Sequence, residues 1–310
     1  MGKEDFIYFD HVTKDFGKRS ILDNLTLSIP SEGIMGIMGL SGCGKTTLLN
    51  VLVGFWKPSK GRVFYNGIDI YGNKRVMDQM FGFATQAGSV YPKLTVEENL
   101  CYFGRMYNMR KKDIDDRIEE LLPLIGLQDS RLELAENLST GMFRRLDIAC
   151  SMVHNPKVLL LDEPTGNLDP VLRKRLMALI KKINDHGTKV IVTSHLLGEV
   201  EKICDTLAIL HKGKIIEMGS PSELKDKYTH DQVIRFETKK KNYESLIPIL
   251  KRKGARNIFQ KDRYMFVYTK NPEKVLDALL TTLKRRRDQL ISVEVSKPSI
   301  EEVFEAATRG

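Results

Sequence analysis

The chain of 310 residues carries a formal net charge of +9, with 42% hydrophobic and 29% charged residues. This balance excludes a disordered chain, and the length allows one large domain or a large domain with a small one. No stretch approaches the roughly 18 apolar residues of a membrane-spanning helix, and the acidic start predicts a protein that stays in the compartment where it is made. The positive charge fits nucleic acid, an acidic membrane surface or plain solubility.

The first seventy residues show short strand-like stretches. Residues 6–9 and 25–29 predict a small antiparallel sheet. Asn66-Gly67 separates residues 61–65 from residues 68–71, and this dipeptide between two strands predicts a hairpin. Four scattered cysteines lack metal-ligand spacing and predict reduced, mostly buried thiols (Cys43, Cys101, Cys150 and Cys204).

A glycine-rich loop lies between an apolar strand, residues 34–38, and a helix-forming stretch, residues 46–52. It fits the phosphate-loop pattern G-x-x-x-x-G-K-[ST], in which backbone N–H groups and the helix N-terminus face a phosphate chain. Lys45 would add charge near the β- and γ-phosphates, and Thr46 would offer a hydroxyl to Mg²⁺. The loop therefore predicts binding of a nucleoside triphosphate by Gly39, Leu40, Ser41, Gly42, Cys43, Gly44, Lys45, Thr46 and Thr47.

The middle of the chain predicts an α/β core. Residues 96–151 are helical in pattern, and three apolar stretches of strand length follow at residues 158–161, 190–193 and 207–210. A helix over residues 197–203 leads to the last of them. Strands that alternate with helices indicate a parallel sheet covered by helices.

After residue 228 the pattern changes. We predict strands at 233–238, 258–259, 264–268 and 291–295, with helices at 243–253 and 271–286. The order βαββαβ is that of a small α+β, ferredoxin-like unit. The predicted domains are thus residues 1–230 and residues 231–310.

Two acids, Asp162 and Glu163, end the strand at residues 158–161. Asp162 at the strand tip would hold Mg²⁺ through water, and Glu163 would orient or deprotonate an attacking water. Acids commonly end strands, so this pair gains its meaning from the motifs around it.

Those motifs follow one order along the chain. After the phosphate loop come Gln86, the stretch Leu138-Ser139-Thr140-Gly141-Met142, the two acids, Gly166-Asn167-Leu168-Asp169, and Ser194-His195. In this order the chain resembles the ATP-binding cassette (ABC) ATPases, the motor subunits of ABC transporters, over residues 5–225. The resemblance implies a P-loop NTPase cassette with a RecA-like core, an antiparallel β-subdomain and a helical subdomain over about residues 96–151.

The resemblance assigns roles to single residues. Phe16 would stack on adenine, although an ordinary core aromatic is the alternative. Gln86 would contact Mg²⁺ and sense the γ-phosphate, and His195 would hold the γ-phosphate and position the water and Glu163. The implied catalytic residues are Glu163, His195, Gln86 and Lys45, and the implied Mg²⁺ ligands are Thr46, Gln86 and Asp162.

The stretch Leu138-Ser139-Thr140-Gly141-Met142 matches the family's signature motif, and this signature stretch would act on a partner cassette. Ser139 and Gly141, at a helix start, would meet the γ-phosphate of ATP bound to the other copy, and Asp169 would lie in the loop that links two nucleotide sites. Thr140 and Met142 depart from the usual Leu-Ser-Gly-Gly-Gln. Methionine there, with Arg144 and Arg145 after it, resembles a branch of drug, antibiotic and lipo-oligosaccharide exporters.

These features predict an ATP-hydrolysing exporter subunit that uses ATP and Mg²⁺. It would form a homo- or heterodimer of cassettes and act on a separate transmembrane permease from the inner, cytoplasmic face of the membrane. The tail at residues 297–304 resembles ABC-2-type exporter ATPases. Basic stretches at residues 239–241 and 284–287 are a solvated face or contact an acidic membrane surface. The alternative function is a soluble ABC-type ATPase acting on ribosomes or nucleic acid, and the C-terminal domain either senses a ligand or supports dimerisation.

Overall fold

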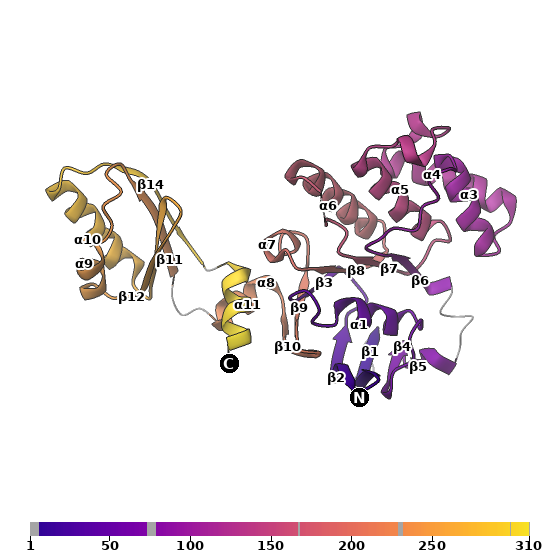
Figure 1. The fold of residues 1–310 in the computed structure, drawn as a ribbon, viewed down its shortest axis with the longest axis horizontal. Helices are drawn as coiled ribbons and strands as arrows, with labels where there is room; N and C mark the ends of the chain where they lie inside the picture. The colour runs from indigo at the N-terminus through magenta and orange to yellow at the C-terminus, as the bar shows by residue number, and fades with distance from the viewer. Residues whose placement is uncertain (1–5, 73–78, 167, 229–231, 298, 310) are drawn as a thin grey trace. The chain divides into compact units, whose positions relative to one another are not determined.

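The computed structural model describes residues 6–72, 79–166, 168–228, 232–297 and 299–309. The chain divides into two compact units between Ser220 and Pro221 (Figure 1). The predicted boundary near residue 230 falls at residues 229–231, outside the described residues. Because the chain divides about ten residues before the predicted boundary, helix α8 (Pro221–Tyr228) belongs to the second unit. There it packs against α11 (Ile300–Arg309).

A six-stranded sheet forms the centre of the first unit, in the order β10-β9-β3-β8-β7-β6. All neighbouring strands run parallel except β10 and β9. Strands β3, β7 and β8 are buried along their whole length, as expected where both faces of a parallel sheet are covered. The strands are β3 (Ile34–Met38), β6 (Phe81–Ala84), β7 (Val158–Asp162), β8 (Lys189–Ser194), β9 (Thr206–His211) and β10 (Lys214–Gly219).

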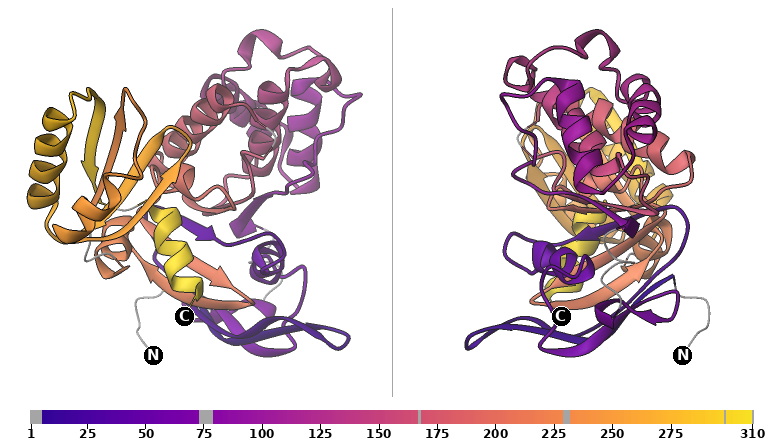
Figure 2. Two further views of the ribbon diagram at one scale, coloured as in Figure 1. Left: turned by 60° about the vertical axis from the view of Figure 1, so that its left-hand side comes forward. Right: turned by 90° about the vertical axis from the view of Figure 1, so that its right-hand side faces the viewer.

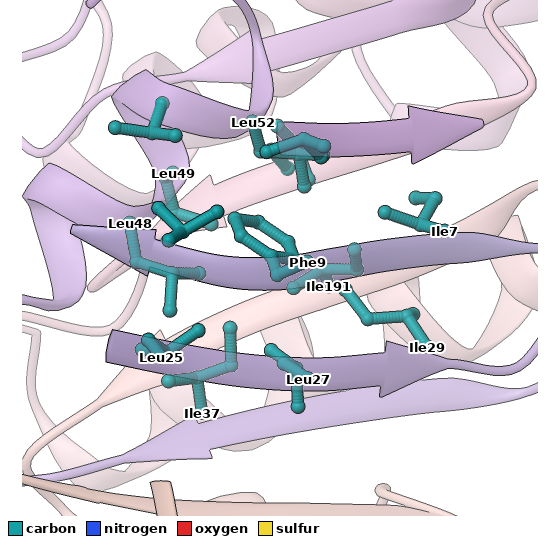
Figure 3. Close-up of a cluster of buried hydrophobic side chains, with 14 of the residues drawn as sticks. Ile7, Phe9, Leu25, Leu27, Ile29, Ile37, Leu48, Leu49, Leu52 and Ile191 are labelled. Atoms are coloured by element: carbon teal, nitrogen blue, oxygen red, sulfur yellow. The ribbon is translucent and has the colours of Figure 1, made fainter. Parts of the chain in front are cut away.

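A second, antiparallel sheet has the order β2-β1-β4-β5, and α1 lies between the two sheets (Figures 1 and 2). Their facing side chains form one core with α1, in which Phe9, Leu27, Ile37 and Leu49 converge (Figure 3). This core fixes the strand that precedes the phosphate loop and the helix that follows it. The elements are β1 (Ile7–Phe16), β2 (Arg19–Ile29), β4 (Lys60–Tyr65), β5 (Ile68–Asp69) and α1 (Lys45–Leu52).

The hairpin predicted at Asn66-Gly67 connects β4 to β5. Both residues have positive φ, 45° and 76°, as a type I′ turn requires. The second strand is shorter than predicted, because the carboxylate of Asp69 accepts the backbone N–H of Tyr71 at 3.0 Å. This local turn replaces the strand with a 3₁₀ helix, Ile70–Gly72.

Helices cover the other face of the six-stranded sheet (Figures 1 and 2). Helix α3 begins with a capping box, in which Thr95 and Glu98 satisfy each other's backbone N–H groups. Helix α7 ends at Val200, earlier than predicted, and turns follow in which the Val200 carbonyl accepts the backbone N–H groups of residues 203 and 204. The helices are α3 (Val96–Met106), α4 (Lys111–Ile125), α5 (Thr140–Met152), α6 (Pro170–Asp185) and α7 (Leu197–Val200), with 3₁₀ turns at Gln128–Ser130 and Ala135–Asn137.

The second unit has its own core and the predicted βαββαβ order. Its antiparallel sheet runs β12-β13-β11-β14, with α9 and α10 on one face (Figure 1). Helix α9 is shorter than predicted because Pro248 fits only its first turn and the hydroxyl of buried Tyr243 donates to the Arg263 carbonyl. The elements are β11 (Gln232–Thr238), α9 (Ile247–Arg252), β12 (Ala255–Lys261), β13 (Tyr264–Thr269), α10 (Pro272–Arg285) and β14 (Leu290–Ser296).

Candidate active site

The phosphate loop joins β3 to the first turn of α1. Gly44 is the N-cap of α1 with φ 114°, a conformation that side chains disfavour. A Cβ atom on Gly39 would collide with the Sγ of Cys43 and the backbone oxygen of Leu210. The sequence thus needs glycine at 44 for the backbone twist and at 39 for close packing. The first N–H groups of a helix have no intrahelical partner, and those of α1 follow directly after the loop.

Lys45 is buried beneath this loop. Its ammonium group donates to the backbone oxygens of Gly39 at 3.0 Å and Leu40 at 3.2 Å. It also lies 3.1 Å from the Oε1 of Glu163, at the end of β7. The positive charge of Lys45 in the loop and the negative charge of Glu163 after β7 therefore lie side by side.

The carboxylate of Asp162 is held between two threonines. Its Oδ2 accepts the hydroxyl of Thr46 at 2.7 Å, and its Oδ1 accepts the hydroxyl of Thr193 at 2.6 Å. Thr193 lies on the neighbouring strand β8, and its oxygen also accepts the backbone N–H of Glu163 at 3.0 Å. Sequence reasoning assigned no role to Thr193; its place just before Ser194-His195 was the only signal.

Glu163 adopts a left-handed backbone conformation with φ 46°. Such a conformation is costly for a residue with a side chain other than Asn or Asp, so the surrounding contacts must maintain it here. Its Oε2 lies 2.8 Å from the Nδ1 of His195, which follows β8. The turn at Glu163 therefore directs one carboxylate toward both Lys45 and His195.

A pocket of about 310 Å³ opens over these groups. It joins loop residues to Gln86, which is exposed at the end of β6. Arg19 and Ile21 of β2 also line it, and neither was predicted from the sequence. The full lining is Arg19, Ile21, Ser41, Gly42, Gly44, Lys45, Thr46, Thr47, Gln86 and Glu163.

Phe16 ends β1 opposite Arg19 of β2. Its side chain is 43% exposed and meets Trp56 edge-on at 5.0 Å. The ammonium group of Lys14 lies 5.0 Å from the Phe16 ring. This exposure is not that of an ordinary core aromatic, so the alternative interpretation of Phe16 is not supported.

The signature stretch starts helix α5. Ser139 is its N-cap and accepts the Met142 N–H at 3.4 Å, and both Ser139 and Thr140 are exposed. Gly141 is buried, and a Cβ there would approach a methyl group of Leu172 to 2.8 Å. Asp169 caps helix α6, and Asn167 lies outside the described residues. Neither Ser139, Gly141 nor Asp169 lines the pocket over Lys45.

Residues 22–166 match the sequence profile of the family described as ABC transporter. The chain is 31% identical to the Nod factor export ATP-binding protein I of Rhizobium sp. (strain N33), over 94% of this chain and 93% of that protein. The chain belongs to the ABC transporter ATP-binding family.

This ABC subunit is also 29% identical to the linearmycin resistance ATP-binding protein LnrL of Bacillus subtilis (strain 168), over 95% of the chain and 96% of that protein. Its fold is shared by cbiO1 from Clostridium perfringens, part of the ABC transporter complex cbiONQ, with a TM-score of 0.66 and 24% identity over 71% of this chain and 90% of that one. These matches confirm the predicted family and cassette fold and favour a transporter subunit over a soluble ATPase of ribosomes or nucleic acid.

The ABC subunit is an ATPase that uses ATP and Mg²⁺, and subunits of its family dimerise and partner with transmembrane permeases. Two residues of the pocket lining, Thr46 and Gln86, and Asp162, which accepts the Thr46 hydroxyl, fit the ion, because a hydroxyl, an amide oxygen and a carboxylate are hard ligands. The described residues contain no cluster of three or more His, Cys, Asp or Glu side chains that would hold a metal by themselves. In general, Mg²⁺ keeps several waters and is bound by one or two carboxylates together with substrate phosphates.

The cysteines of the ABC subunit are free thiols. Burial raises the pKa of Cys43 in the phosphate loop, although the charge of Lys45 opposes the rise. A thiol with a raised pKa is protonated at neutral pH and is a poor nucleophile, so Cys43 acts as a small packing residue. None of the helices in the described part of the chain combines the length and apolar character that crossing a membrane requires.

Proposed function

We propose that this chain hydrolyses ATP with Glu163 as the general base and so drives an export transporter. The observation that carries the proposal is the contact of one carboxylate with both Lys45, at 3.1 Å, and His195, at 2.8 Å, beside the phosphate loop. A base must lie within hydrogen-bond reach of the water it activates, and an orienting partner fixes its direction. The cassette would span residues 1–230, with an accessory domain at residues 231–310.

The roles follow from the chemistry of each group. Lys45 and the N–H groups of the α1 N-terminus bind the β- and γ-phosphates and offset the charge that develops on them. Glu163 takes a proton from the water that attacks the γ-phosphorus, and His195 holds the Glu163 carboxylate in position. Gln86 orients groups at the same phosphate, and Phe16 stacks on adenine at the pocket edge. Thr46, Asp162 and Gln86 would hold Mg²⁺, which neutralises phosphate charge when bound.

A second cassette completes the site in this proposal. Ser139 and Gly141 would bind the γ-phosphate held by the partner copy, because an exposed serine at a helix N-terminus, where backbone N–H groups lack intrahelical partners, suits an anion. Asp169 would carry contacts between the two nucleotide sites. Hydrolysis removes the shared anion, and the two copies separate.

The membrane partner is a separate permease, engaged through the helical part at residues 96–151 and the segment after Gln86. Support for export comes from two relatives of nearly full length, one named for Nod factor export and one for linearmycin resistance. The Met142-Arg144-Arg145 pattern and the tail at residues 297–304 agree with that class. The chain would then lie at the inner, cytoplasmic face of the membrane.

An acidic membrane surface is a further proposed partner. A pocket of about 430 Å³ between α9 and α10 is lined by four basic side chains together with Ile249 and Thr282 (Arg252, Lys253, Arg285 and Arg286). All four are exposed. Grouped arginines and lysines attract anionic lipid headgroups, so this basic pocket would hold the C-terminal unit at the bilayer.

The test of the hydrolytic site is Glu163→Gln in the full chain. The amide keeps the size of the carboxylate but takes up no proton, so the variant should bind ATP, accumulate as a dimer and lose at least about 100-fold in kcat. Lys45→Ala should lose ATP affinity as well as rate. The control is Glu120→Gln on α4, whose carboxylate is exposed and pairs with Arg117. Full turnover by Glu163→Gln would remove Glu163 from its proposed role.

A further inference from the structure

An ion pair in the second turn of α5 lies just beyond the signature stretch. The Nη1 of Arg144 is 2.9 Å from the Oδ2 of Asp147, one helical turn later. The two side chains are only 12% and 1% exposed. Buried charges are costly unless their polar atoms find partners. The hydrogen-bond partners of Arg144 and Asp147 therefore indicate which backbone segments the pair fixes.

The pair holds the backbone on both sides of Gln86. Arg144 Nη1 donates to the carbonyl of Thr85 at 2.9 Å, and Asp147 Oδ1 accepts the N–H of Ser89 at 2.8 Å. The Thr85 carbonyl also accepts the N–H of Gly88 at 3.2 Å, so Gln86 lies within a closed turn. Both ends of that turn are tied to α5.

Arg144 also holds the backbone on both sides of Glu163. Its Nε donates to the carbonyl of Pro164 at 3.1 Å, and its Nη2 donates to the carbonyl of Asp162 at 3.3 Å. Glu163 between them has the left-handed conformation that only surrounding contacts can maintain. One guanidinium group thus contacts the flanks of two residues that come from different strands.

The charge balance of the pair agrees with a fixed structural arrangement. Burial lowers the pKa of the Arg144 guanidinium, while the charges of Asp147 and Asp162 oppose that change. Burial raises the pKa of the Asp147 carboxyl, and Arg144 opposes that change. Each charge is therefore the main compensation for the other, and loss of either leaves a buried charge without its partner.

We propose that Arg144 and Asp147 are positioning residues that couple the signature helix to Gln86 and Glu163 of the same chain. Neither side chain lines the pocket over Lys45. A displacement of α5 by phosphate contact at Ser139 would move the backbone beside Gln86 and Glu163, because the ion pair joins all three. This inference rests on the proposed function, since it assumes that Gln86 and Glu163 act on ATP.

The experiment measures ATP affinity and kcat separately for Arg144→Met in the full chain. Methionine keeps the apolar stem but donates to none of the carbonyls of Thr85, Asp162 and Pro164. We expect kcat to fall by roughly 10- to 100-fold while the Kd for ATP changes by less than about twofold, because misplacement of catalytic groups lowers rate without removing phosphate contacts. Arg144→Lys keeps the charge beside Asp147 but not the planar fork, so it should restore part of kcat.

The control is Lys189→Met at the start of β8. Lys189 is also a buried cation that donates to a backbone carbonyl, that of Glu32, but it does not line the pocket over Lys45 and belongs to no proposed binding surface. It should leave kcat within about twofold even if the melting temperature changes. Equal loss of kcat in Arg144→Met and Lys189→Met, or a Kd that rises as much as kcat falls, would overturn the coupling.

Glu163→Gln, measured in parallel, separates this inference from the proposed function. If Glu163→Gln is inactive and Arg144→Met is fully active, the coupling is wrong and the proposed function stands. If Glu163→Gln turns over ATP at the normal rate, the proposed function fails, and the coupling through Glu163 fails with it.

Discussion

The hydroxyl of Thr193 hydrogen-bonds to both acids of the site, Asp162 and Glu163, and so fixes their positions relative to each other. Its hydroxyl is fully buried, donates to Asp162 and accepts from the backbone of Glu163. Thr193→Val keeps the shape of the side chain but leaves a carboxylate oxygen and an N–H group without this partner. We expect a loss of about 1–3 kcal/mol in the free energy of unfolding and a roughly tenfold lower kcat.

Thr238 provides a matched control for that prediction. It is also fully buried in a strand, but its hydroxyl has no hydrogen-bond partner among the described residues. Thr238→Val removes an unsatisfied polar group, so the free energy of unfolding should stay constant or rise by about 1 kcal/mol. Urea unfolding measures both variants. The assignment of Thr193 is contradicted if the two substitutions change stability in the same direction.

At the residue scale, the sequence predicted those site residues that belong to linear motifs. Lys45, Thr46, Asp162, Glu163 and His195 lie together in the structure, although their individual roles stay predictions. Residues that act through tertiary contacts were missed, because their partners lie far away in the chain. Examples are Thr193 with Asp162, and Arg144 with the flanks of Gln86 and Glu163.

At the element scale, His154 joins the helical part to the central sheet. It follows α5, its Nε2 lies 3.2 Å from the carbonyl oxygen of Phe81 in β6, and its ring stacks on Tyr107 beyond α3 at 3.6 Å. The Nδ1 atom is buried with no hydrogen-bond partner in the described part of the chain. This environment favours the neutral ring, and burial lowers the pKa of His154 to about 4.

The lowered pKa of His154 predicts that acid weakens the packing of the helical part on the central sheet. The unfolded chain takes up a proton at this histidine near pH 6.5, whereas the folded chain does so only near pH 4. Stability from the neutral ring is thus fully present above pH 6.5 and is lost as the pH falls from 6.5 to 4, by about 2–3 kcal/mol. Thermal unfolding of His154→Phe between pH 7 and pH 4.5 should show a smaller decline than the unchanged chain. An identical decline would contradict the prediction.

Elements with strong local signals were predicted well, and their ends were not. The hairpin at Asn66-Gly67 formed because both residues tolerate positive φ, a local property that the sequence displays. The strand after it was predicted too long, since an Asp69 side chain redirected the backbone. Helix α9 was also predicted too long, because burial of Tyr243 is a tertiary effect that periodicity does not reveal.

At the scale of the whole molecule, the order of elements predicted the fold of each unit but not the place where the chain divides. The alternation of strands and helices predicted the parallel sheet, and the order βαββαβ predicted the fold of the C-terminal unit. The division at Ser220 depends on packing of α8 with α11, which lie at opposite ends of the second unit's sequence. An ion pair between Lys297 and Asp226 joins the same two regions. The residues at the division mark the start of a helix but do not show that its packing partner lies near the end of the chain.

The basic pocket between α9 and α10 leads to a prediction about the whole chain at a membrane. Lys253→Glu combined with Arg285→Glu reverses two of its four exposed charges. Because each basic residue near an anionic surface contributes about 1 kcal/mol, affinity for vesicles containing phosphatidylglycerol should fall at least about tenfold. Binding should also weaken when added salt screens the charges. Co-sedimentation with vesicles measures it.

The control reverses Lys111 and Lys112, two exposed lysines in the first turn of α4. This pair makes the same change in net charge outside the second unit. If attachment depends on the basic pocket, only the change at Lys253 and Arg285 should lower affinity strongly, whereas a general effect of net charge would lower both equally. Unchanged binding after reversal of Lys253 and Arg285 would show that the basic pocket does not contact the lipid.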